Sequence, residues 1–276
     1  MAAILILGAL VFLHEYGHYI CARMTGTPMT RFSIGFGRRL FACSFLRAPN
    51  DSCGMPSYVF SWVVTGKGGT QVVLARSPLK QKISSLLCLV MGTIVWEIRL
   101  LPFGGFVDPQ MSRDKPRLFR DSLVILGGPV VNFLIAFSLL TLCHMVDHHL
   151  SFLDAAQLSA SSILGMIQET FQFLLHPFGG SGEVSGPIGI ITIGKTYVQQ
   201  GWIGISLFAA SLSCSLAIVN MLPIPPLDGG ALLFVWIRTF SPKRGARIEA
   251  VVHGLGTIGI IALFIGITIH DITKLF

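Results

Sequence analysis

The strongest chemical signal in this chain is a pair of histidines beside a glutamate, in the sequence His14-Glu15-Tyr16-Gly17-His18. It matches the pattern H-E-x-x-H. Residues i and i+4 share one face of a helix, so both imidazoles can bind one Zn²⁺ ion. The Glu15 carboxylate can then take a proton from a water that the metal activates. The alternative is a chance match with two satisfied core histidines. It is less favoured, because ionisable groups in an apolar helix need a metal or a partner.

A catalytic zinc site also needs a third protein ligand, and Asp228 is the best candidate. It is the only acidic residue near the end of the third apolar segment. Prolines at positions 223, 225 and 226 forbid a continuing helix before it. We therefore expect extended backbone there, lining protein or a water-filled cavity. Taken alone, Asp228 is better explained as a helix-capping or turn residue before two glycines, and the H-E-x-x-H motif is what favours the ligand.

The composition indicates a membrane protein that crosses the bilayer several times. Hydrophobic residues make up 52% of the 276 residues and charged residues 12%, against about 25% charged in a soluble domain. This excludes general disorder and disfavours a soluble enzyme. Four segments are long and apolar enough to span the hydrocarbon core: Ala2–Met24, Ser122–Met145, Trp202–Leu222 and Val251–Ile269. A fifth, Leu86–Trp96, is short and rich in β-branched residues, which favours a strand.

The distribution of basic residues predicts an orientation. Lys and Arg concentrate in the loops after the first and third spans, so these loops should be cytoplasmic and both termini outside. This rule also accounts for the net charge of +7. The chain lacks a zinc-knuckle pattern and a basic stripe interleaved with aromatic residues, and we expect no nucleic-acid partner. Between the second and third spans, Ser151–Ser185 should form an interfacial helix and turn outside the membrane.

Together the two motifs resemble the site-2 protease family of intramembrane zinc metalloproteases. The family pattern N-x-x-P-x-P-x-x-D-G is matched by Asn220, Pro223, Pro225, Asp228 and Gly229. Three further segments are similar to the family's β-loop, its G-x-x-N segment and the stretch before its third core span: Leu101–Val107, Gly127–Asn132 and Gly186–Ile190. The bacterial regulators of sigma-E type are the most similar group.

The resemblance implies an all-α integral membrane fold, with four core transmembrane helices and a small membrane-associated β-loop. It implies that zinc is the cofactor, with His14, His18 and Asp228 as ligands and Glu15 as the catalytic base. The residues that would position the substrate or stabilise the oxyanion are Asn132 and Asn220, and those that would hold an unwound substrate as an added strand are Gly104, Gly105 and Phe106. Two simpler alternatives stay open: an ordinary turn at the glycines, and an interhelical hydrogen bond for Asn132.

The resemblance also implies a substrate and a location. The substrate would be a transmembrane helix of another membrane protein, such as an anti-sigma factor or similar signalling precursor, in the bacterial inner membrane. We expect residues 1–276 to form a single domain without the PDZ domains usual in sigma-E regulators, because the second loop is too short. Residues of about 42–93 would be an insertion in the first cytoplasmic loop. Its Cys43 and Cys53 leave a disulfide open, although we expect none that is structural.

Two other functions use the same features. A catalytically silent scaffold could bind transmembrane helices, but it would have no need of Glu15 beside the histidines. A metal-ion transporter could use the same ligands, but it should carry inverted repeats and paired broken helices. The sequence contains only one such broken segment, at the prolines before Asp228.

Overall fold

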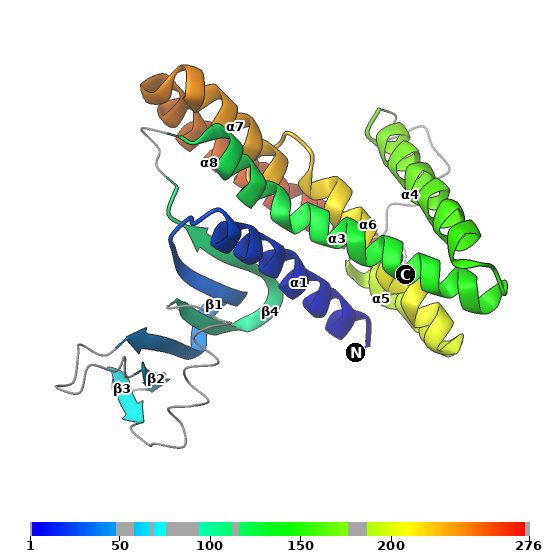
Figure 1. Cartoon of the computed structure of the whole chain (residues 1–276), viewed down its shortest axis with the longest axis horizontal. Helices are drawn as coiled ribbons and strands as arrows, with labels where there is room; N and C mark the ends of the chain where they lie inside the picture. The colour runs from blue at the N-terminus through cyan, green and yellow to red at the C-terminus, as the bar shows by residue number, and fades with distance from the viewer. Residues whose placement is uncertain are drawn as a thin grey trace. The chain divides into compact units, whose positions relative to one another are not determined.

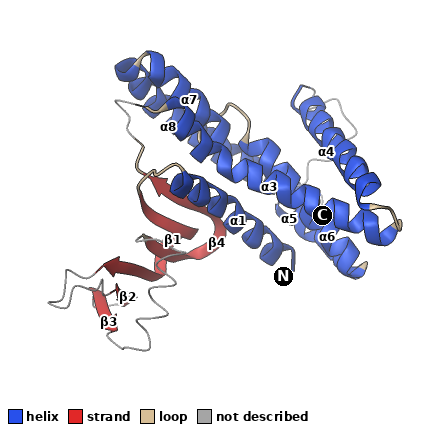
Figure 2. Cartoon of the chain, viewed as in Figure 1, coloured by secondary structure: helices blue, strands red, loops and turns tan. Residues whose placement is uncertain are grey.

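The chain divides into a helical unit and a sheet unit in the computed structural model (Figures 1 and 2). The structure describes residues 2–47, 58–66, 69–75, 94–111, 116–175 and 187–273. The first unit comprises Met1–His18 with Ser112–Phe276, and the second comprises Tyr19–Met111. Helices dominate, and the strands form one small sheet, which confirms the predicted fold class.

Four helices of the described residues are long and apolar enough to cross a membrane. They are α1 (Ala2–Met24), α3 (Leu118–Asp147), α6 (Gly201–Asn220) and the stretch Ile248–Ile269 within α8 (Pro242–Thr273). These are the four spans that the sequence predicts, with ends that differ by a few residues. The 30 residues of α3 would extend about 45 Å at the usual helical rise. It is therefore long enough to project beyond the hydrocarbon core.

Within the helical unit, α3 is the central element. It packs against α6, α4 (Phe152–Leu175) and α7 (Asp228–Phe240), while α5 (Pro187–Gln199) packs on α6 and α8 on α7. The helix expected within Ser151–Ser185 is α4, and residues 176–186 lie outside the described part of the chain. The sequence did not predict α5 and α7, because helices of 13 residues owe most of their stability to packing.

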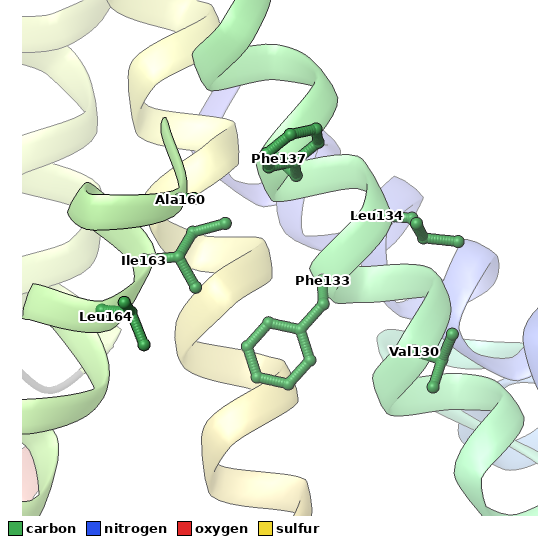
Figure 3. Close-up of a pocket in the computed structure, with 7 residues that line it drawn as sticks. All are labelled: Val130, Phe133, Leu134, Phe137, Ala160, Ile163 and Leu164. Atoms are coloured by element: carbon green, nitrogen blue, oxygen red, sulfur yellow. The ribbon is translucent and has the colours of Figure 1, made fainter. Parts of the chain in front are cut away.

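The contact between α3 and α4 combines one polar link with an apolar hollow. The hydroxyl of Thr141 donates to the hydroxyl of Ser159 at 3.1 Å. Beside this link a hollow of about 440 Å³ opens between the two helices (Figure 3). It is lined by Val130, Phe133, Leu134, Phe137, Ala160, Ile163 and Leu164. The hollow carries no ionisable lining residue, so we assign it no chemistry.

The second unit is a four-stranded antiparallel sheet with the strand order β3-β2-β1-β4. The strands are β1 (Met29–Arg47), β2 (Tyr58–Gly66), β3 (Gly69–Ala75) and β4 (Val95–Pro109). The sheet is larger than the β-loop expected at Leu101–Val107. Of the strand predicted at Leu86–Trp96, Val95 and Trp96 begin β4, and residues 86–93 lie outside the described part. Cys53 also lies outside it, so the open disulfide stays untested.

Aromatic stacking and a buried ion pair hold β1 against β4. Phe32 stacks on Trp96 with ring centroids 4.3 Å apart. The buried Glu97 carboxylate binds Arg39 at 2.7 Å and Arg99 at 2.8 Å. Arg39 lies in β1 and Glu97 in β4, so their ion pair joins the two strands, while Arg99 of β4 gives the buried carboxylate a second cationic partner.

Candidate metal centre

Glycines allow α1 to lie directly on α3 at the H-E-x-x-H motif. A Cβ atom at Gly17 would overlap the carbonyl oxygen of Gly127. A Cβ atom at Gly128 would overlap His18 Nε2 and lie 2.7 Å from His14 Nε2. The two helix backbones therefore meet where neither has a side chain. This close approach leaves room for both imidazole rings against α3.

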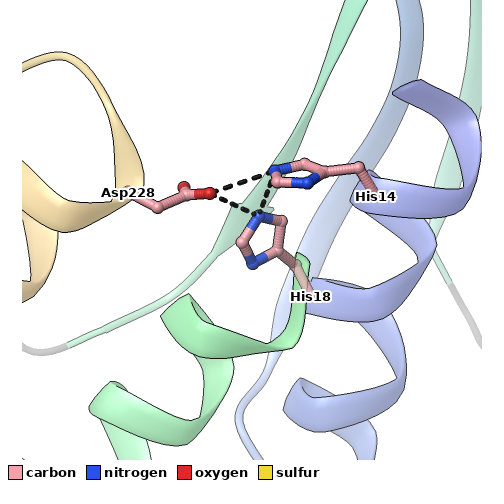
Figure 4. Close-up of side chains that lie close together, drawn as sticks. All are labelled: His14, His18 and Asp228. Carbon is pink, nitrogen blue, oxygen red and sulfur yellow. Dashed lines mark hydrogen bonds and ion pairs between the residues drawn. The ribbon is translucent and has the colours of Figure 1, made fainter. Parts of the chain in front are cut away.

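Three side chains converge at this crossing, as Figure 4 shows. His14 Nε2 lies 3.0 Å from Asp228 Oδ2, and His18 Nε2 lies 3.4 Å from the same oxygen. The two Nε2 atoms are 3.3 Å apart. The structure thus brings together two histidines from the first span and an aspartate more than two hundred residues later.

The three donor atoms fit a zinc ion by both their chemistry and their spacing. Imidazole nitrogen and carboxylate oxygen are ordinary zinc ligands, bound at about 2.0–2.2 Å. Tetrahedral geometry at those bond lengths separates neighbouring donors by about 3.3–3.6 Å. The observed triangle, with sides of 3.0, 3.3 and 3.4 Å, is close to one face of such a tetrahedron. The fourth position would then stay free for a water or a substrate, as in catalytic sites.

Hydrogen bonds behind the rings orient them. His18 Nδ1 donates to the carbonyl oxygen of Val124 at 2.8 Å, which leaves the Nε2 lone pair directed at the site. Behind His14, the Nδ2 amide of Asn132 donates to Nδ1 at 3.1 Å. A second amide, Asn220 Nδ2, lies 3.3 Å from His14 Nε2. Both predicted asparagines therefore contact the same ring.

The electrostatics of the site favour an ionised aspartate. Burial raises the pKa of Asp228, but the hydrogen bonds from His14 and His18, together with their charge when the rings are protonated, outweigh burial and hold this pKa at about 2. The carboxylate is therefore in its metal-binding form at neutral pH. Its side chain is 23% exposed, against 8% for His14 and 11% for His18. The centre is thus more accessible on the aspartate side than on the histidine side.

Asp228 reaches the histidines through a tightly packed turn after α6. The helix ends at Asn220 and α7 begins at Asp228, so the intervening prolines break the helix as the sequence predicts. Three glycines allow the backbone of this turn to be closely packed. A Cβ atom at Gly229 would overlap the backbone of Met221 and Leu222. A Cβ atom at Gly230 would lie 2.5 Å from the Pro225 nitrogen. A Cβ atom at Gly256, in α8, would overlap the carbonyl oxygen of Pro225.

The remaining predicted residues lie in two places. Glu15 is half-buried on α1, and its charge acts on His18. Gly104, Gly105 and Phe106 lie in β4, within the sheet unit. Gly104 has a positive φ of 83°, and Gly105 and Phe106 pair with Ile34 and Ser33 of β1. Gly104 and Gly105 thus belong to a bent strand rather than to the ordinary turn that was the simpler alternative.

Comparison with known proteins assigns a family. The model of peptidase family M50 matches residues 2–48 and 81–266, and both motifs of the metal centre lie within the match. The chain belongs to peptidase family M50. The unmatched residues of this M50 peptidase, 49–80, lie within the insertion expected at about 42–93.

Relatives agree with the assignment. A Fusobacterium nucleatum protein named as a zinc metalloprotease is 22% identical over 335 residues, which cover this whole chain and 99% of the relative. The regulator of sigma-W protease RasP of Bacillus subtilis is 42% identical over 94 residues, or 34% of this chain and 22% of RasP. The RasP zinc metalloprotease of Shouchella clausii is 33% identical over 133 residues, 46% of this chain and 31% of the relative. Both matched stretches span less than a third of those two proteins.

The M50 peptidase is an integral membrane zinc metalloprotease that acts in intramembrane proteolysis, and zinc is its cofactor. Of the three functions that the sequence left open, the family match therefore supports the protease.

Two residues that shape the candidate metal centre were not predicted from the sequence. The Val124 carbonyl gives no side-chain signal, because every residue carries one. Gly256 does carry a signal in the sequence, because small residues within apolar spans often mark close contacts between helices.

Proposed function

We propose that His14, His18 and Asp228 are the zinc ligands of this peptidase and that Glu15 is its general base. The near-equilateral triangle of donor atoms carries the ligand assignment. The position of Glu15 next to His14, with its charge acting on His18, supports its role.

The proposed reaction is hydrolysis of a peptide bond. When bound, zinc supplies a Lewis acid that makes water more acidic and polarises the scissile carbonyl. Glu15 accepts the proton of the attacking water and returns it to the nitrogen of the leaving amine. Asn220, which is half-buried at the end of α6, can donate its amide N–H to the substrate carbonyl oxygen as negative charge develops there.

The substrate is proposed to be a membrane protein cleaved in or near a transmembrane helix. A helix keeps its amides in internal hydrogen bonds, so the scissile segment must unwind. Among the described strands, residues 105–107 of β4 have partners in β1 alone. The other side of this strand, at Gly105 and Phe106, is then available to add an unwound segment as a further strand. Gly104 provides the bend that precedes it.

The cellular role is proposed from the relatives and the charge pattern. RasP of Bacillus subtilis is named as a regulator of sigma-W, and by analogy the substrate is an anti-sigma factor or similar signalling precursor. The location is the bacterial inner membrane, with both termini outside because the two basic loops are cytoplasmic. Residues 1–276 form one metalloprotease domain, and the loop between the second and third spans is too short to hold a PDZ domain. A tag at either terminus should then react with an impermeant reagent on intact spheroplasts. If the tags react only after lysis, the termini lie on the cytoplasmic side and the proposed orientation is wrong.

The reaction is tested by incubating purified full-length protein with a panel of transmembrane peptides. Glu15→Gln should lower turnover by about 10²–10⁴-fold, because a neutral amide cannot accept the proton. Its zinc content should stay unchanged, since Glu15 is not a ligand. The control is Thr141→Val, which alters a buried polar group of α3 in its contact with Ser159 of α4. Equal turnover by the wild type and Glu15→Gln would remove the assigned base.

A further inference from the structure

The side chain of Asn132 is enclosed behind the metal centre. It is 0% exposed, in the middle of α3. Its Nδ2 donates to His14 Nδ1 at 3.1 Å. Its Oδ1 is buried and has no hydrogen-bond partner within the part of the chain that the structure describes. A buried amide with one unsatisfied end requires an explanation, because such a group is costly to leave unpaired.

The contact with Asn132 determines which nitrogen of His14 accepts a hydrogen bond, because an amide NH₂ group can only donate. With Nδ1 accepting from Asn132, the proton of a neutral ring is on Nε2. Nε2–H can then donate to Asp228 Oδ2, 3.0 Å away. The three side chains thus form a directed chain of donors that runs from Asn132 through His14 to Asp228.

Zinc binding at Nε2 would change the kind of hydrogen-bond partner that His14 Nδ1 requires. When Nε2 binds a metal, the proton of the neutral imidazole moves to Nδ1, and the group facing Nδ1 must accept a hydrogen bond. His18 already has such an acceptor in the Val124 carbonyl, 2.8 Å from its Nδ1. His14 instead faces an amide NH₂ group, which cannot accept.

We propose that Asn132 is a positioning residue for His14, whose amide turns by half a rotation so that Oδ1 accepts from Nδ1–H in the zinc-bound state. The inference rests on the ligand set of the proposed function. It gives the orphaned Oδ1 a partner and gives His14 the acceptor that His18 already has. An amide suits this position because it offers a donor or an acceptor at the same place.

The burial of Asn132 separates this role from the one implied by the family resemblance. A group that is 0% exposed and lies against His14 contacts a ligand rather than a substrate. The neighbouring Ser213 hydroxyl donates to the backbone carbonyl of Asn132 at 2.8 Å, so it does not serve Oδ1. That bond ties this turn of α3 to α6 and holds the side chain against the ring.

The proposal is tested by zinc affinity, measured on the purified full chain in detergent by competition with a chromophoric chelator. Asn132→Leu keeps the approximate volume but removes the acceptor, and should weaken zinc binding by about 10–100-fold. Asn132→Asp keeps only acceptors and should bind zinc at least as tightly as the wild type. The control Thr141→Val should match the wild type. Helix content and elution volume check that each variant is folded, and Asn132→Ala provides a second acceptor-free variant.

The outcomes distinguish the inference from the proposed function. Wild-type affinity in Asn132→Leu and Asn132→Ala would overturn the positioning role. So would equal weakening of the Asp and Leu variants, since the amide shape would then matter rather than the acceptor. Lost turnover with unchanged zinc affinity in every Asn132 variant would assign the amide to the substrate instead. If the wild type itself binds no zinc, the proposed ligand set fails, and this inference fails with it.

Discussion

At the scale of single residues, Gly128 lies directly against the His14 and His18 rings of the candidate metal centre. A Cβ there would overlap His18 Nε2 and lie 2.7 Å from His14 Nε2. Gly128→Ala should therefore displace the rings and weaken zinc binding by at least about tenfold, in the range caused by disturbing outer contacts of a ligand. Chelator competition on the purified protein measures this.

Gly165→Ala is the matched control for that substitution. Gly165 also lies within a helix, but a Cβ there meets nothing within 4 Å. Replacing a helical glycine by alanine is intrinsically stabilising by about 1 kcal/mol, so this variant should be at least as stable as the wild type and bind zinc equally well. A Gly128→Ala protein with normal zinc affinity would mean that the rings have room to move.

Single residues were also where the sequence was most informative. His14 and His18 are related by helical spacing, which is local, and Asp228 follows from the need for a third ligand. The interhelical hydrogen bond that we kept as the simpler alternative for Asn132 is present, but its partner is His14. That partner could not be predicted, because it depends on how α1 crosses α3.

At the scale of elements, α8 closes over the turn that carries Asp228. A Cβ at Gly256 would overlap the carbonyl oxygen of Pro225, a backbone atom that cannot move aside cheaply. Gly256→Ala should push the turn away and shift Asp228, three residues on from Pro225. We expect weaker zinc binding together with lower turnover, measured by chelator competition and by cleavage of a transmembrane peptide.

Gly259→Ala tests whether that effect comes from the turn rather than from the helix. Gly259 lies in the same helix, and a Cβ there meets nothing within 4 Å. This variant should keep wild-type zinc affinity and turnover. If both alanine variants behave alike, α8 does not position the Asp228 turn.

The elements also show where sequence reasoning is weak. The four spans were predicted because a fixed hydrocarbon thickness demands a fixed apolar length. The extent of the sheet was not predicted, because β1 and β4 are separated by more than forty residues and pair with several register shifts. Strand pairing at that separation, and short helices such as α7, depend on contacts that a local pattern does not contain.

At the scale of the whole molecule, composition and two motifs predicted a membrane metalloprotease, and the family match confirms it. Neither motif supplies the proposed ligand set alone, because two of the three proposed ligands lie on α1 and the third lies on α7. The folding of the helical unit is thus what completes the proposed site. Zinc bound by the intact chain should also stabilise its fold, since the unfolded chain holds no preformed site.

The most direct test of the account is the zinc content per chain, measured by mass spectrometry on purified wild-type, His14→Ala, His18→Ala and Asp228→Ala proteins prepared identically. The account predicts about one zinc ion per chain in the wild type and strongly reduced content in each of the three variants, because no pair of the remaining donors makes a complete site. Full zinc occupancy in any one of the three variants would contradict it.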